Sequence, residues 1–334
     1  MRRVCYPLGL LISTAGLAAL VTAQSAPADS PAWAYGVPAT PVPAAANSGG
    51  GAGGPRQPDT SLKRIPDSTR SFTLEQLRDF FNVADWFPDD HPPMPDVFVH
   101  GRAPDVRGCG MCHMPNGKGR PENAPIAGLP SVYVEQQLID FKNDLRTSAD
   151  ARKTNTLLMI QAAKAMTDEE IKAAAAYLAA MPWTPWIRVV EADTVPKMRI
   201  AGNVFLPAAE GGTEPIGNRI VETPEDAERF ELRDPHSGFI AYVPRNSVAK
   251  GAALAAGGGN RTLPCRVCHG DDLNGLGPVP GIAGRSPSYI VRQLWDIQQG
   301  ARKGAWSPLM TQVVAKLTQD DMLNLAAYAA SLGR

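Results

Sequence analysis

The sequence predicts a mainly α-helical protein, in which two similar helical domains are joined by an irregular, β-containing insertion. A five-residue motif occurs twice, at 109–113 and at 265–269. Segments that match one another follow each copy at a nearly constant offset, which indicates an internal duplication. The stretch between the copies has no counterpart in the repeat and carries β-like apolar runs. These observations predict domains at 66–182 and 247–334.

The N-terminal region predicts export rather than a folded element. Residues 1–23 resemble a secretory signal peptide, in which two arginines precede the apolar run Leu8–Val21 and a small-residue cleavage site follows. This run is short for a membrane span, which needs about 20 residues, so cleavage is favoured over a retained anchor. Residues 24–65 are rich in Ala, Pro, Gly and Ser and predict a disordered leader. We therefore expect a periplasmic protein.

Capping signals and four-residue apolar spacing predict helices in both copies. Thr73 and Thr167 each precede a residue that can complete a capping box, and Ser286 precedes a proline at a first helical position. A short helix is expected at 97–100. The alanine-rich final helix of each copy is expected to pack closely against the helix that precedes the motif. The matched segments are Ile126-Ala127-Gly128 with Ile282-Ala283-Gly284, Gln137-Leu138 with Gln293-Leu294, Leu158-Met159 with Leu309-Met310, and Ala175-Ala176-Tyr177 with Ala326-Ala327-Tyr328.

Residues 183–246 form the predicted insertion between the two domains. Its β-like runs are 187–190, 198–206 and 239–243, with Gly and Asp-Pro punctuation between them. Such apolar runs are usually buried in soluble chains, and structureless connections of this length are uncommon. We expect the insertion to cover both domains, with a docking surface for a redox partner as the alternative.

Each copy of the repeated motif is Cys-x-x-Cys-His, the attachment signature of haem c. The two thiols can add to the two porphyrin vinyl groups, and the adjacent histidine can become the proximal iron ligand. A four-cysteine zinc site would leave the histidines unexplained, and a redox dithiol would make one copy redundant. The motif therefore predicts two covalently bound haem c groups, attached through Cys109, Cys112, Cys265 and Cys268, with His113 and His269 on the irons.

Two methionines at equivalent positions of the repeat are the candidates for the second axial ligand. Met159 and Met310 each precede the last helix of their copy, where a loop could fold over the far face of the ring. A single methionine could equally be a core residue, but the pairing favours ligation. The competing side chains are expected in the core, on the surface or in loops: Met166, His91, His100 and His236.

Over 95–182 and 247–334 the chain resembles the class I c-type cytochromes, and most closely the dihaem cytochrome c4-like group. The resemblance implies that a Pro-x-Ile-Ala-Gly segment runs past each proximal histidine and orients its ring through a backbone carbonyl. Pro280–Gly284 matches this pattern, whereas the first copy begins with Ala124 in place of proline. The insertion and the long leader are further departures from a compact cytochrome c4.

The predicted function is electron transfer rather than catalysis. Basic and acidic residues balance at 33 each, so nothing in the charge predicts nucleic-acid binding. The protein would carry electrons between a periplasmic or membrane dehydrogenase and a terminal oxidase or other carrier, with both haems ligated by His and Met. One alternative is a dihaem enzyme, such as a peroxidase or a thiosulfate dehydrogenase. Another is a non-catalytic cytochrome subunit of a dehydrogenase, in association with a membrane respiratory complex.

Overall fold

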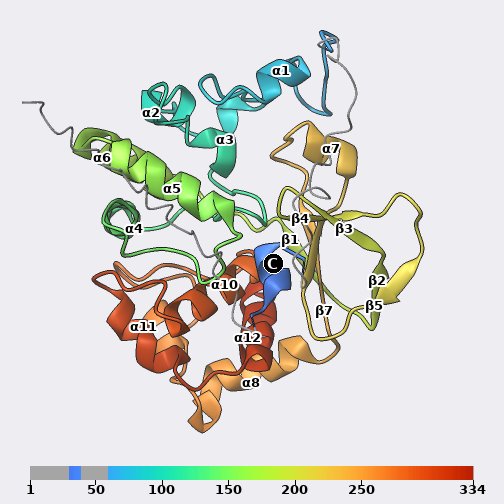
Figure 1. Cartoon of the computed structure of the whole chain (residues 1–334), viewed down its shortest axis with the longest axis vertical. Helices are drawn as coiled ribbons and strands as arrows, with labels where there is room; N and C mark the ends of the chain where they lie inside the picture. The colour runs from blue at the N-terminus through green and yellow to red at the C-terminus, as the bar shows by residue number, and fades with distance from the viewer. Residues whose placement is uncertain (1–29, 39–58, 334) are drawn as a thin grey trace, which may run out of the picture.

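The computed structural model describes residues 30–38 and 59–333, and its elements fall into three groups (Figure 1). One helical group, cyan to green in the figure, lies above a second that is orange to red, and the strands lie beside them. The predicted signal peptide and most of the predicted leader lie outside the described residues. Among the helices described, none is both long enough and apolar enough to cross a bilayer.

The first helical group surrounds the first copy of the motif. Capping boxes at Thr73 and Thr167 start two of its helices, as the sequence predicts. Its core includes Phe98 and Tyr177, whose ring centroids are 4.6 Å apart. The helices are α1 (Leu74–Leu77), α2 (Asp96–Val99), α3 (Gly110–His113), α4 (Ser131–Lys142), α5 (Thr154–Ala165) and α6 (Asp168–Ala179), and the 3-10 helix η3 spans Pro88–Asp90.

The second helical group repeats this arrangement around the second motif. The final helix packs closely on the helix that precedes the motif, as the alanine pattern predicts. At Gly251 the approach leaves no room for a side chain, because a Cβ there would lie 1.9 Å from the backbone oxygen of Asn324. The helices are α8 (Ser247–Gly257), α9 (Arg266–His269), α10 (Pro287–Gln298), α11 (Ser307–Val314) and α12 (Gln319–Ser331), with η4 at Gly258–Asn260.

The insertion folds into short strands and one helix. In its main sheet β1 is parallel to β7, and β6 is antiparallel to β7. The run at 198–206 is a hairpin of two strands rather than a single strand. The strands are β1 (Ile187–Glu191), β2 (Thr194–Pro196), β3 (Met198–Ala201), β4 (Val204–Pro207), β5 (Thr213–Pro215), β6 (Val221–Pro224) and β7 (Phe239–Val243), and the helix is α7 (Ala227–Glu231).

The insertion contacts both helical groups. Phe239 and Ala241 of the main sheet belong to the same buried core as Leu323 of α12. On the other side, the Trp86 indole donates a 2.8 Å hydrogen bond to the carbonyl of Leu232, just after α7. These contacts agree with the expectation that the insertion covers both domains.

A segment of the predicted disordered leader is packed in the centre of the molecule. The 3-10 helix η1 (Ala32–Tyr35) lies beside α10 (Figure 1). Tyr35 is fully buried and donates a 2.6 Å hydrogen bond to the Asp296 carboxylate, while Arg292 donates to a carbonyl of η1. The prediction of disorder for 24–65 is therefore wrong for this segment. Aromatic side chains within the Pro/Ala-rich stretch give it apolar surface that the core buries.

The two helical groups meet across an approximate two-fold axis. The amide of Thr147 donates to the carbonyl of Ala301 at 2.8 Å, and the amide of Lys303 donates to the carbonyl of Leu145 at 2.8 Å. Each residue of one hydrogen bond lies 156 positions from its equivalent in the other, which is the offset between the two motifs. The duplication is therefore expressed as a symmetric contact.

Candidate functional site

The first motif sits on the short helix α3, held against α2. The amide of Cys109 donates to the carbonyl of Val97, and the Cys109 thiol also points toward that carbonyl at 3.4 Å. A Cβ at Gly110 would lie 3.1 Å from the Val83 side chain and 3.2 Å from the Phe98 ring, so a larger residue at this spacer position would require these side chains to shift slightly. Among the described residues, none of the four predicted attachment cysteines pairs with another in a disulfide, so each sulfur is available for a bond to a vinyl group.

Each predicted proximal histidine contacts a backbone carbonyl through its Nδ1 atom. The Nδ1 atom of His113 lies 3.0 Å from the carbonyl oxygen of Ala124, and that of His269 lies 2.8 Å from the carbonyl oxygen of Pro280. Burial lowers the pKa of both imidazoles, which favours the neutral form. A neutral ring that donates from Nδ1 keeps Nε2 available for a metal. Ala124 thus supplies the orienting carbonyl without the family's proline.

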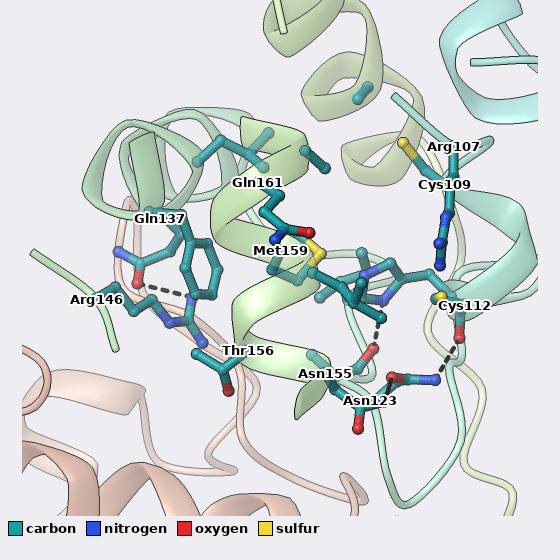
Figure 2. Close-up of a pocket in the computed structure, with 18 of the residues that line it drawn as sticks. Arg107, Cys109, Cys112, Asn123, Gln137, Arg146, Asn155, Thr156, Met159 and Gln161 are labelled. Atoms are coloured by element: carbon teal, nitrogen blue, oxygen red, sulfur yellow. Dashed lines mark hydrogen bonds between the residues drawn. The ribbon is translucent and has the colours of Figure 1, made fainter. Parts of the chain in front are cut away.

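A cavity of about 680 Å³ opens beside the first motif. It is lined by Cys109, Cys112, His113 and Met159 together, so the structure brings all four predicted residues of the first site to one place. Figure 2 shows Met159 and both cysteines around this space. The volume falls in the range of small-molecule and cofactor sites.

Five basic side chains line the cavity, and three of them are buried. Arg146, Lys153 and Arg292 are each at most 8% exposed. Burial lowers the pKa of Lys153 well below its ordinary range. Buried cations are costly unless an anion accompanies them. The basic side chains outnumber the carboxyl groups in the lining, which are Asp105, Glu122 and Asp296. This excess of positive charge fits the two haem propionates, and the apolar part of the wall fits the ring.

Arg146 has a counterpart in the second copy, which is Arg302. Arg146 donates to Gln293 at 3.0 Å, and Arg302 donates to Gln137 at 2.7 Å. Each arginine also donates to the glutamine of its own domain, at 3.0 Å. Figure 2 shows the bond between Arg146 and Gln137. A symmetric polar network therefore joins the domains beside the first cavity.

The two candidate axial methionines lie on helices, not in loops. Met159 is on α5 and Met310 is on α11, and each is half-buried. The expectation of a loop before the last helix is therefore wrong, although both side chains keep equivalent places in the repeat. Met310 packs against the core of the second helical group.

The competing ligands differ in their surroundings. Met166 is 4% exposed within the core, as predicted, but it also lines the first cavity. The other candidates have polar partners elsewhere: His91 contacts Asp85 and the Tyr177 hydroxyl, His100 contacts the carbonyl of Phe81, and His236 contacts Asp90. Met166 differs from Met159 in the repeat, because the second copy has Leu317 at the position equivalent to Met166 and a methionine at the position equivalent to Met159.

Sequence reasoning missed several residues that line the first cavity. Tyr35 and Lys153 lie outside both motifs, and Arg292 and Asp296 come from the other helical group. The signal of Arg292 and Asp296 in the sequence is their charge among the apolar residues of α10, and Tyr35 and Lys153 have no such signal. Neither the duplication nor the motif spacing indicates that one domain completes the cavity of the other.

Comparison with known proteins finds similarity to cytochromes and to an electron acceptor. The family model for cytochrome c matches residues 104–182. The thiosulfate dehydrogenase electron acceptor of Stutzerimonas stutzeri is 26% identical over 243 residues, covering 71% of this chain and 85% of that protein. Cytochrome c-554(548) of Halomonas halodenitrificans is 36% identical over 81 residues, 24% of this chain and 98% of that protein. Cytochrome c4 of Thiocapsa roseopersicina is 43% identical over 68 residues, covering 20% of this chain and 33% of that protein.

Proposed function

Because the chain belongs to the cytochrome c family and is similar to the dihaem cytochrome c4, we propose that it is a periplasmic electron carrier. It carries two covalently bound haem c groups, each of which supplies a one-electron ferric/ferrous couple. Electrons would enter from a dehydrogenase and leave to a terminal oxidase or another carrier.

We assign haem attachment and ligation to the residues of the two motifs and the paired methionines. Cys109 and Cys112 would form the thioether bonds of the first site, with His113 and Met159 as axial ligands. The equivalent residues of the second site are Cys265, Cys268, His269 and Met310. Support comes from the backbone carbonyl that each histidine ring contacts through Nδ1, which leaves Nε2 available for the iron.

The observation that carries the proposal is the joint lining of the first cavity by His113 and Met159. A sixth position filled by methionine is typical of electron carriers, whereas catalytic haems keep that position open. Methionine ligation also raises the reduction potential. We therefore favour a carrier over a peroxidase or another dihaem enzyme.

A dehydrogenase for a reduced sulfur compound is the donor that we propose to test first. The relative from Stutzerimonas stutzeri is named as an electron acceptor of thiosulfate dehydrogenase, and the similarity extends over 85% of its length. The test mixes the oxidised protein anaerobically with thiosulfate and catalytic amounts of a thiosulfate dehydrogenase, and follows haem absorbance. Reduction should require the dehydrogenase and should involve both haems.

Two controls separate the alternatives. Thiosulfate alone should leave the protein oxidised, and reduction without the dehydrogenase would instead favour an enzyme. Carbon monoxide should bind slowly to the reduced protein because methionine must first leave the iron. Rapid binding at either haem would contradict the carrier proposal at that site. A further test is co-purification from native membranes, which would identify a dehydrogenase subunit.

A further inference from the structure

One buried arginine connects the loops behind both proximal histidines. Arg285 is 4% exposed and follows the Ile282-Ala283-Gly284 segment of the second copy. Its Nε donates to the carbonyl of Gly281 at 2.6 Å within its own domain. Its two terminal nitrogens reach into the first domain, where they donate to the carbonyls of Pro125 and Ala127 at 2.7 and 3.0 Å.

These carbonyls neighbour the ones that the histidine rings contact. Pro125 directly follows Ala124, whose carbonyl lies against His113. Gly281 directly follows Pro280, whose carbonyl lies against His269. A single guanidinium therefore bonds to the peptide group next to each orienting carbonyl. The first copy has Leu129 at the position equivalent to Arg285, so only the second domain supplies an arginine for this connection.

The guanidinium is held in place and keeps its charge. Its carbon lies 4.2 Å from the centre of the Trp183 ring, and the Trp183 indole donates to the carbonyl of Ala283 at 3.0 Å. Burial lowers the pKa of Arg285 to about 10, so the side chain remains protonated at neutral pH. All three of its hydrogen bonds go to neutral carbonyls, which leave its positive charge uncancelled.

We propose that Arg285 is a positioning residue shared by both haem sites, which fixes the two orienting loops and raises the reduction potential of both haems. The inference rests on the two haem sites and is independent of which donor or acceptor the protein uses. The direction of the expected change in reduction potential follows from the charge of the arginine. A ferric haem carries one more positive charge than a ferrous haem, so a fixed cation nearby disfavours the ferric form. Hydrogen bonds to the groups that orient a metal ligand tune the metal through that ligand.

The test compares Arg285→Gln with the natural holoprotein in a spectropotentiometric titration, with each potential assigned to its haem by the shifted haem methyl signals in NMR. Arg285→Gln should lower both potentials, and Arg285→Lys, which keeps the charge, should recover most of the loss at the second haem. Arg261→Gln is the matched control, because it removes a half-exposed arginine of the same domain, which pairs with the Asp321 carboxylate. It should leave both potentials unchanged.

The proposal is overturned if Arg285→Gln shifts only one potential, shifts neither, or shifts them in opposite directions. If that variant fails to mature with haem, Trp183→Leu provides the test. Loss of the indole would admit water around the guanidinium and screen its charge, so both potentials should fall by less than in Arg285→Gln. Unchanged potentials, or a change at one haem alone, in Trp183→Leu would also overturn the proposal.

Discussion

Tyr35 tests whether the leader segment is part of the folded protein. The side chain is fully buried, and its hydroxyl donates to Asp296 at 2.6 Å. Replacing a buried aromatic residue by alanine costs about 3–5 kcal/mol of unfolding free energy, and we expect Tyr35→Ala to fall in this range. Tyr35→Phe keeps the ring but deprives a buried carboxylate of one donor, which costs about 1–3 kcal/mol. Asp296 still accepts from the amide of Ala149 at 2.8 Å, which favours the lower end.

The assay is urea unfolding of the holoprotein, followed by circular dichroism. Leu62→Ala is the control from the same N-terminal region, because Leu62 is 62% exposed and its loss should change stability by no more than about 0.5 kcal/mol. A Tyr35→Ala protein as stable as this control would refute the packing of η1. So would a Tyr35→Phe protein less stable than Tyr35→Ala, because the hydroxyl cannot contribute more than the whole side chain.

Three further predictions concern the haem sites and the insertion. The mature protein should exceed its polypeptide mass by two haem groups that acid does not extract, as measured by mass spectrometry. Met159→Ala and Met310→Ala should each lower the potential of one haem and remove its weak far-red ferric band, whereas Met166→Leu should keep both, and a native spectrum in either alanine variant would exclude that ligand. Burial raises the pKa of Glu222, so the folded protein binds the carboxyl proton more tightly than the unfolded chain does. The folded protein therefore loses stability as the pH rises from the pKa of Glu222 in the unfolded chain to its higher pKa in the folded protein. Glu222→Gln should therefore melt at a higher temperature than the natural protein at about pH 8, with the gap closing toward about pH 4; a gap independent of pH would contradict this.

The local signals in the sequence were sufficient for the helices with a side-chain cap and for the motifs. Thr73, Thr167 and Ser286 cap helices in the structure as their neighbours predict. Each capping bond joins residues three positions apart, so a short window contains the whole interaction. The same holds for the motif, where two thiols and a histidine on one turn of helix are specified by spacing alone.

The contacts between distant segments could not be predicted in this way. Tyr35 and Asp296 are 261 residues apart, and Arg285 bonds to Pro125 across 160 residues. Neither Tyr35 nor Arg285 belongs to a periodic pattern, and the sequence around a buried arginine has no signature that distinguishes it from an exposed one. The helical placement of Met159 was missed for a related reason. Its segment has weak capping signals, with Lys153 at the N-cap and no side-chain cap bond.

The two copies share their chemistry but differ in what covers them. Val267 is 64% exposed and Cys268 is exposed, whereas the equivalent Met111 and Cys112 are half-buried. The cover over the first motif includes Arg233, just after α7, whose guanidinium donates to the carbonyl of Met111. Because Arg233 belongs to the insertion, sequence outside the repeat creates this difference. The motif therefore determines that each copy can hold a haem, while the insertion determines how open the surface around each motif is to a partner.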